Sequence, residues 1–176
     1  MTKLYIVEGL PCSGKSTTSK YIADLLEKSG KKVCFFDEGS GNHPTDYEFP
    51  MYETMMRFNL AKEESFEYIE QIYHIISPLE PMIIYLKNDD VAEQIKTTSE
   101  ERTGWLDAVI DYHVNGGFGK SISAEGFDGY LECLKERQRR ELEYLKMTKL
   151  PSIIIENAHR NWQQAYDKIV DRIFLD

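Results

Sequence analysis

The sequence predicts a three-layer α/β/α fold built on a short, mostly parallel sheet. Four short runs, at residues 4–7, 33–36, 82–86 and 153–155, are apolar nearly throughout. Strands with this composition are typical of parallel sheets whose two faces are both covered by helices. Segments with apolar residues at helical spacing separate the four runs. The chain has 176 residues, so we expect a single domain over residues 1–176.

The first half of the chain alternates predicted strands and helices around two loops. The first helix has apolar residues at helical spacing, and Gly30 is placed to end it as a C-terminal cap. Glycine, proline, asparagine and aspartate are frequent in the second loop. The predicted elements are a strand at 4–7, a glycine-rich loop, a helix ending near Gly30, a strand at 33–36, a loop over 37–50 and a helix over 66–76.

The second half continues the same alternation. Asn88 or Asp89 can cap the short helix that follows the third strand. On the long helix, Glu136–Arg140 and Arg137–Glu141 have the i,i+4 spacing of ion pairs on a solvated face. The predicted elements are a strand at 82–86, a short helix with Val91 and Ile95, a helix over 106–113 ending at Gly116-Gly117, a long helix over 127–145, a strand at 153–155 and a helix over 162–173.

Composition and charge exclude several classes of protein. No apolar run approaches the roughly 20 residues needed to cross a bilayer, and we expect a cytoplasmic protein without a membrane partner. The 3 cysteines show no metal-ligand or disulfide spacing. The formal net charge of −9 repels phosphate backbones, so long nucleic acid is not an expected partner. The oligomeric state stays open, with a homodimer as one expectation.

The strongest motif is a glycine-rich loop between the first strand and the first helix. Residues 9–16 read GLPCSGKS and match G-x-x-x-x-G-K-S. The glycines let successive backbone N–H groups converge on a phosphate, and the helix N-terminus favours negative charge. Lys15 can reach the β- and γ-phosphates, and Ser16 can ligate Mg²⁺. The motif predicts ATP and Mg²⁺ as ligands, with loop contacts from Gly9, Pro11, Cys12, Ser13, Gly14, Lys15, Ser16 and Thr17.

Residues 4–30, LYIVEGLPCSGKSTTSKYIADLLEKSG, resemble the opening of P-loop kinases, notably thymidylate-kinase-like and other nucleoside-monophosphate-kinase-like proteins. IIYLKNDDVAEQI resembles a later strand of these kinases and a helix leading to a lid. SIIIENAHRNW resembles their last strand and base-contacting loop. EGSGNHPTDYE and WLDAVIDYHVNGGFGK resemble a little-characterised bacterial group in the same P-loop NTPase superfamily. The resemblance implies a P-loop NTPase fold and ATP-dependent phosphoryl transfer.

Two acidic residues directly follow the predicted second strand. Ligands of open parallel sheets bind at the carboxyl ends of the strands, where Asp37 and Glu38 would lie. Either carboxylate could orient Mg²⁺ or accept a proton from an acceptor hydroxyl, and the resemblance favours Glu38. They could equally be solvated loop carboxylates. In the same loop, His43 is either a substrate contact or part of a turn.

Several basic residues are candidates for contacts around the reacting phosphate. Arg102 and Lys120 are lid candidates, and Arg57 is a candidate on the acceptor side, although each could be an ordinary surface charge. After the last strand, Asn157 and Arg160 could contact the nucleotide base or begin the following helix. The expected catalytic set is therefore Lys15, Glu38 and Arg102.

Two functions from different classes remain open. The first is an ATP-dependent kinase that transfers the γ-phosphate to a small-molecule acceptor, such as a nucleotide. The second is a non-catalytic nucleotide-binding sensor or partner-binding domain derived from a kinase. The second is motivated by a departure from the kinase pattern, in which a further strand carries an acidic motif. Here the segment over 47–57 runs toward a helix instead.

Overall fold

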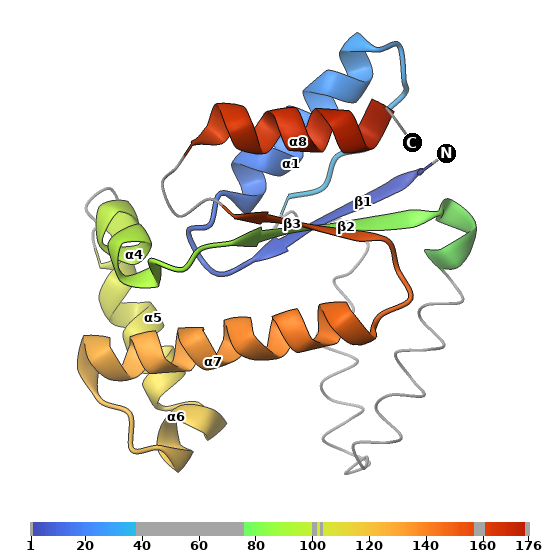
Figure 1. Cartoon of the computed structure of the whole chain (residues 1–176). Coiled ribbons are helices and arrows are strands. Elements are labelled where there is room, and N and C mark those ends of the chain that lie inside the picture. The colour runs from blue at the N-terminus through green and yellow to red at the C-terminus, as the bar shows by residue number, and fades with distance from the viewer. Residues whose placement is uncertain (1, 38–75, 100–101, 103, 157–160, 175–176) are drawn as a thin grey trace. The chain divides into compact units, whose positions relative to one another are not determined.

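The computed structural model describes residues 2–37, 76–99, 102, 104–156 and 161–174. The chain forms two compact units, one from residues 1–5 and 16–81 and the other from residues 6–15 and 82–176. The elements, labelled in Figure 1, are β1 (Leu4–Gly9), α1 (Lys15–Lys28), the 3-10 turn η1 (Ser77–Leu79), β2 (Pro81–Lys87), α4 (Val91–Ser99), α5 (Trp105–Val114), α6 (Gly117–Ser121), α7 (Gly126–Met147), β3 (Ser152–Glu156) and α8 (Trp162–Phe174).

In the first unit, helix α1 ends where the sequence predicts. Gly30 adopts a left-handed backbone with φ +81°. Its N–H donates to the Glu27 carbonyl at 2.9 Å, and the Lys31 N–H donates to the Leu26 carbonyl at 3.0 Å. This pair of hydrogen bonds is a Schellman cap, which satisfies carbonyls that the helix leaves without partners. The predicted role of Gly30 is confirmed.

The prediction of a strand over residues 33–36 is wrong. Residues 31–37 have no regular secondary structure, and the side chains of Phe35 and Phe36 are each 43% exposed. An apolar run forms a strand only where a neighbouring strand accepts its backbone hydrogen bonds, and four residues cannot specify such a neighbour. Most of the predicted helix over 66–76 and most of the predicted loop over 37–50 lie outside the described residues.

Most residues of the described sheet belong to the second unit, and the strand order is β1-β2-β3. Strands β2 and β3 run parallel, with Ile83 opposite Ser152 and Leu86 opposite Ile155. In the central strand β2, side chains facing both sides of the sheet are buried, which explains its nearly continuous apolar sequence. The predicted α/β fold with a short parallel sheet is confirmed, with three of the four expected strands present.

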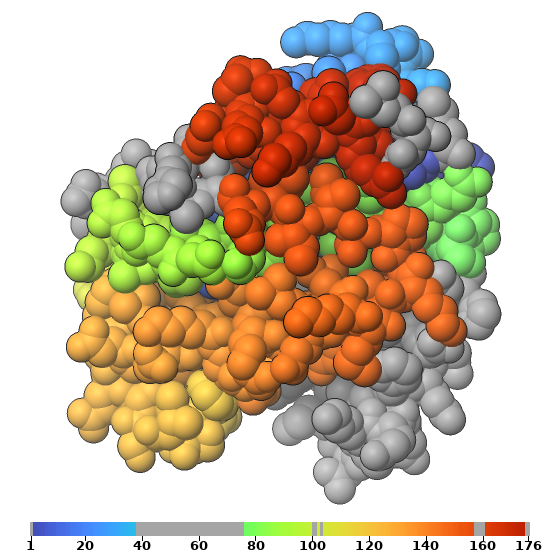
Figure 2. All heavy atoms as spheres, in the orientation of Figure 1, coloured from blue at the N-terminus to red at the C-terminus, as the bar shows by residue number. Residues whose placement is uncertain are grey.

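Helices cover both faces of β2 and β3 in this unit. Figure 1 shows α8 on one face and α7 on the opposite face, and Figure 2 shows β3 at the surface between these two helices. Helix α8 buries one stripe at four-residue intervals, formed by Ala165, Ile169 and Ile173. Both helices are present where apolar spacing predicts them, and together with the sheet they form three layers.

A second apolar cluster joins the phosphate loop to the helices beside it. Its buried members are Leu10 from the loop, Val91 and Ile95 from α4, and Tyr130 and Leu134 from α7. Burial of these side chains removes apolar surface from water and fixes α4 against α7. The loop is therefore anchored in the core through the side chain of Leu10.

Helix α4 begins where the sequence predicts, but a different residue caps it. The Asp90 side chain accepts a hydrogen bond from the Glu93 N–H at 3.1 Å, as an N-cap residue does. The Asn88 side chain instead accepts from the Asp90 N–H at 2.8 Å. The prediction that Asn88 or Asp89 caps the helix is wrong because Asn88 supports the residue that performs this role.

Helix α5 and the glycine-rich segment after it pack against α7. The predicted helix over 106–113 is confirmed, and the glycine-rich segment around Lys120 folds as the short helix α6. At Gly119, a Cβ atom would overlap the carbonyl oxygens of His113 and Val114. Glycine is needed here because α6 lies this close to the end of α5, rather than because the segment is a loop.

Polar contacts on α7 match the predicted ion pairs and add a partly buried hydrogen bond to the sheet. Glu136–Arg140 and Arg137–Glu141 both form at 2.6 Å. Glu141 also accepts a hydrogen bond from the Tyr85 hydroxyl of β2 at 2.7 Å. This contact fixes α7 to the sheet through a charge-assisted hydrogen bond. None of the helices that the structure describes combines the length and apolar composition needed to cross a membrane.

Replacing Tyr85 by phenylalanine should lower the free energy of unfolding by about 1.5 kcal/mol, because a hydrogen bond to a half-buried carboxylate is lost. Burial and the hydrogen bond to Glu141 hold the pKa of Tyr85 above its ordinary value. The Tyr85 hydroxyl therefore contributes fully to the free energy of unfolding below about pH 10. This contribution falls as the pH rises further, because the Tyr85 hydroxyl ionises at a lower pH in the unfolded chain than in the folded protein. Urea unfolding at neutral and alkaline pH measures both effects. Tyr144→Phe, at a site 58% exposed, is the control and should change little; an equal effect would contradict the prediction.

Candidate phosphate-binding site

The loop that joins β1 to α1 has an unusual backbone. Three of its residues have positive φ angles, which are +150° at Gly9, +66° at Cys12 and +91° at Gly14. A turn hydrogen bond from the Ser13 N–H to the Leu10 carbonyl, at 3.2 Å, closes the loop. Alternation between right-handed and left-handed conformations turns successive N–H groups toward one side, which is how backbone forms an anion-binding concavity. The loop backbone is therefore suited to phosphate.

Both motif glycines occupy positions where a side chain would clash. A Cβ atom at Gly9 would lie 2.6 Å from the carbonyl oxygen of Leu86 in β2 and 2.7 Å from the Ser13 hydroxyl. A Cβ atom at Gly14 would overlap the indole ring of Trp162, the first residue of α8. The glycines thus serve close packing as well as backbone freedom. Trp162 supports the loop from the side of α8.

The Lys15 ammonium lies over the loop itself. Its Nζ donates to the carbonyl oxygens of Gly9 at 3.0 Å and Leu10 at 3.3 Å. This placement keeps a positive charge beside the loop N–H groups. Ser16 and Thr17 are exposed in the first turn of α1, which carries no acidic residue. The first turn of α1 therefore contributes no carboxylate of its own that would repel an anion.

One buried hydroxyl in the loop is left without a partner among the described residues. The Ser13 Oγ atom is buried and makes no hydrogen bond there. Buried polar groups are normally paired, so an orphan in a loop of this shape indicates that a ligand can complete it. The backbone concavity, Lys15 and this hydroxyl together fit a polyphosphate chemically.

Cys12 is half-buried, and its side chain packs against the apolar cluster that contains Leu10 and Tyr130. A cysteine at φ +66° adopts a conformation that residues with a side chain rarely take. The thiol therefore helps to anchor the loop tip in the core.

A chain of buried amides holds the loop from the side of α4. The Gln94 Nε2 atom donates to the Pro11 carbonyl at 2.7 Å. The Gln94 Oε1 atom accepts from the Asn88 side chain, and the Asn88 backbone is hydrogen-bonded by Gln138 of α7. All three amide side chains are buried. The loop is therefore connected through hydrogen bonds to two helices.

Sequence reasoning missed these amides, although a signal was present. On α4 the buried face consists of Val91, Gln94 and Ile95, so a glutamine occupies an inward position. On α7, Gln138 continues the buried stripe of Tyr130 and Leu134 at four-residue spacing. A polar residue at a core position of an amphipathic helix indicates a buried partner.

The remaining predicted site residues are dispersed or lie outside the described chain. Asp37 is exposed in the irregular segment 31–37 of the first unit. Arg102 is exposed, and its guanidinium lies 5.8 Å from the centre of the Trp105 ring. Lys120 is exposed on α6, and Figure 1 shows α6 on the opposite side of α7 from the sheet. Those outside the described residues are Glu38, His43, Arg57, Asn157 and Arg160.

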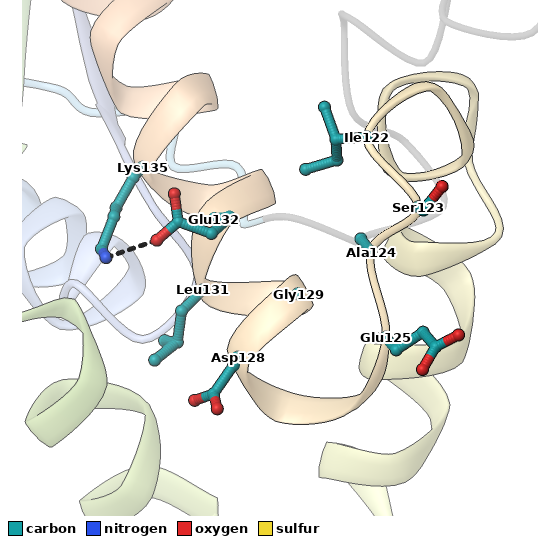
Figure 3. Close-up of a pocket in the computed structure, with 9 residues that line it drawn as sticks. All are labelled: Ile122, Ser123, Ala124, Glu125, Asp128, Gly129, Leu131, Glu132 and Lys135. Carbon is teal, nitrogen blue, oxygen red and sulfur yellow. Dashed lines mark hydrogen bonds and ion pairs between the residues drawn. The ribbon is translucent and has the colours of Figure 1, made fainter.

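A shallow pocket elsewhere in the second unit lacks phosphate chemistry. It lies at the turn between α6 and α7, and Figure 3 shows the residues that line it. Three of them are acidic, and the Glu132 carboxylate is paired with Lys135 at 2.6 Å. Carboxylates on a pocket wall disfavour an anionic ligand. The loop remains the best candidate for a phosphate site among the described residues.

Comparison with known proteins supports this interpretation of the loop. Residues 2–75 match the family model described as chromatin associated protein KTI12. The match includes β1, the phosphate loop and α1, and it covers fewer than half of the chain's 176 residues. No curated protein and no solved structure is significantly similar to the chain. The family match supports a P-loop NTPase-like protein and does not extend to the thymidylate-kinase-like group.

Gly14→Ala should destabilise the protein by about 3 kcal/mol, because it combines a strained positive φ with a clash against Trp162. Gly30→Ala is the matched control, since Gly30 also has positive φ but a Cβ there would meet nothing within 4 Å. We expect the control to cost about 1 kcal/mol in urea unfolding. Equal costs for the two variants would show that Trp162 does not constrain the loop. A smaller cost of Gly14→Ala when Trp162 is already replaced by alanine would support the contact.

Proposed function

We propose that the protein is an ATP-dependent phosphotransferase that moves the γ-phosphate of ATP to a small-molecule acceptor. One observation carries this proposal, namely a strand–loop–helix unit in which three positive φ angles shape the backbone around Lys15. Such a loop binds phosphates through backbone N–H groups. The overlap of the KTI12 family match with this unit supports the same conclusion.

Different groups of the loop would bind different parts of Mg-ATP. The backbone N–H groups would hold the β- and γ-phosphates, and Lys15 would exchange its two loop carbonyls for phosphate oxygens. The exposed Ser16 hydroxyl is the candidate magnesium ligand. No cluster of three or more His, Cys, Asp or Glu suited to a metal occurs among the described residues. Water and phosphate oxygens would complete the magnesium shell.

The acceptor is proposed only as a class. A thymidylate-kinase-like activity would make it a nucleoside monophosphate, whereas other P-loop kinases phosphorylate alcohols. Glu38 or Asp37 would orient Mg²⁺ or take the proton of an acceptor hydroxyl, and Arg102 would meet the charge on the transferring group. A mobile lid would exclude water once both substrates are bound.

Lys15→Ala should weaken Mg-ATP binding by about 100-fold, because a cationic hydrogen-bond donor to the phosphates is lost. Isothermal titration calorimetry with the full chain measures this change. Lys28→Ala, an exposed lysine at the other end of α1, should bind within about twofold of the unchanged protein. Tight Mg-ATP binding by Lys15→Ala would contradict the assignment of the loop.

Phosphotransfer should be detected as ADP formation that depends on an added acceptor. The panel should contain nucleoside monophosphates, nucleosides, sugars and other small alcohols, each with Mg-ATP. Lys15→Ala should abolish the turnover, since it removes charge stabilisation of the transferring group. Absence of turnover with every acceptor, despite tight ATP binding, would overturn the kinase proposal and leave nucleotide binding intact.

The alternative function is a kinase-derived nucleotide-binding module that acts on a partner without catalysis. The description of the matched family as chromatin associated favours it, since that description concerns association rather than metabolism. The net charge of −9 makes a protein partner a better fit than DNA for such a role. This alternative predicts that ATP raises thermal stability without turnover. An ATP affinity that does not change when Mg²⁺ is removed would also favour it.

A further inference from the structure

We propose that Gln94 is a positioning residue that holds the phosphate loop in its binding conformation through the Pro11 carbonyl. The proposal rests on the proposed nucleotide binding and adds a residue of α4 to the machinery that supports it. Gln94 contacts the loop through the backbone carbonyl of Pro11. It would therefore act on affinity by fixing the direction of a peptide group.

The peptide between Pro11 and Cys12 is the part of the loop that Gln94 controls. The Gln94 Nε2–H donates to the Pro11 carbonyl at 2.7 Å. In a trans peptide the carbonyl and the following N–H point in opposite directions. The Cys12 N–H consequently points away from Gln94, and the next torsion is the left-handed φ of +66°. This conformation costs about 1–2 kcal/mol for a residue with a side chain, so it needs an external hold.

The direction of the hydrogen bonds in the amide chain is fixed at both ends. At one end the Asp90 backbone N–H can only donate, and it donates to the Asn88 Oδ1 atom at 2.8 Å. Asn88 must then present its Nδ2 group to Gln94, which accepts through Oε1. At the other end the Pro11 carbonyl can only accept. Because the Oε1 atom of Gln94 already faces Asn88, its Nε2 group is the part of the amide that faces Pro11. A donor is thus required at this position, and a carboxylate there would oppose the carbonyl oxygen.

Burial makes this requirement strong. Asn88 and Gln94 have exposed fractions of 6% and 4%. Water is therefore a poor substitute for a missing donor, and an unpaired buried carbonyl is costly. Gln138 holds the backbone of Asn88 through two hydrogen bonds, at 3.3 Å and 3.1 Å. It belongs to the same buried chain, but both of these hydrogen bonds go to Asn88 and neither goes to the loop.

The test compares Gln94→Glu with Gln138→Glu, which places the same substitution in the same buried chain away from the loop. When the carboxyl introduced by Gln94→Glu is protonated, its O–H can donate to the Pro11 carbonyl and replace the native amide. When this carboxyl ionises, its oxygen faces the Pro11 carbonyl oxygen with no proton between them, so the hydrogen bond to the loop is lost. Burial raises the pKa of such a carboxyl, so titration between about pH 5.5 and about pH 9 should reach both forms. Mg-ATP affinity is measured by calorimetry as a ratio to the unchanged protein at each pH.

We expect Gln94→Glu to bind Mg-ATP within about twofold of the unchanged protein at the acidic end and about tenfold more weakly at the alkaline end. Gln138→Glu should stay within about twofold throughout, although it is also destabilised. Gln94→Met has a side chain that cannot titrate, so it should bind Mg-ATP more weakly than the unchanged protein by a factor that does not change with pH. A pH-independent ratio for Gln94→Glu, or an equal loss in Gln138→Glu, would overturn the positioning role. If Gln94→Glu fails to fold, the constant loss in Gln94→Met decides the proposal.

A measurement without nucleotide separates this proposal from the proposed function. The backbone amide resonance of Cys12 should shift with the titration of the introduced carboxyl in Gln94→Glu, because the peptide that Gln94 holds is reoriented. It should not shift in the unchanged protein or in Gln138→Glu over the same pH range. If the unchanged protein binds no ATP, the proposed function fails, and the Cys12 resonance still decides whether Gln94 sets the loop conformation.

Discussion

The hydrogen bond from Gln94 to the Pro11 carbonyl is the interaction on which the candidate site depends most. A phosphate loop must hold several N–H groups toward one point, and its backbone then adopts angles that are unfavourable alone. Gly9 and Gly14 meet this requirement through the absence of a side chain, but Cys12 does not. The loop tip is therefore held from outside, by the Gln94 amide on one side and by the burial of Leu10 in the core on the other.

The same contacts explain how an acidic protein can present a site for an anion. The net charge of −9 describes the whole molecule, whereas a bound phosphate interacts mainly with groups within a few ångströms. Among the described residues, the groups at the loop include its backbone N–H groups, the Lys15 ammonium and the first turn of α1, which has no acidic residue. Acidic side chains gather instead on α7 and around the pocket before it, where several are paired with lysine or arginine.

Most elements of the fold could be predicted because their signals are local. The apolar stripes of α7 and α8, the capping glycine of α1 and the run that forms β2 are all visible in the sequence. The run at 33–36 has the same appearance as a buried strand, yet it has no regular structure. Composition cannot tell whether a neighbour completes the hydrogen-bonding ladder. For the same reason the sequence predicts Asn88 as a cap, whereas in the structure it supports Asp90 and Gln94.

The sequence by itself determined where the candidate phosphate loop lies, because the spacing of Gly9, Gly14, Lys15 and Ser16 follows from what a short backbone segment needs around a phosphate. Only the tertiary structure decided what holds that loop in place. Gln94 is 83 positions from Pro11, and Gln138 is 50 positions from Asn88. Trp162 reaches Gly14 from the last helix. Such contacts depend on how helices and strands pack, and a hydrogen bond between distant residues leaves no local pattern beyond a polar residue on an apolar face.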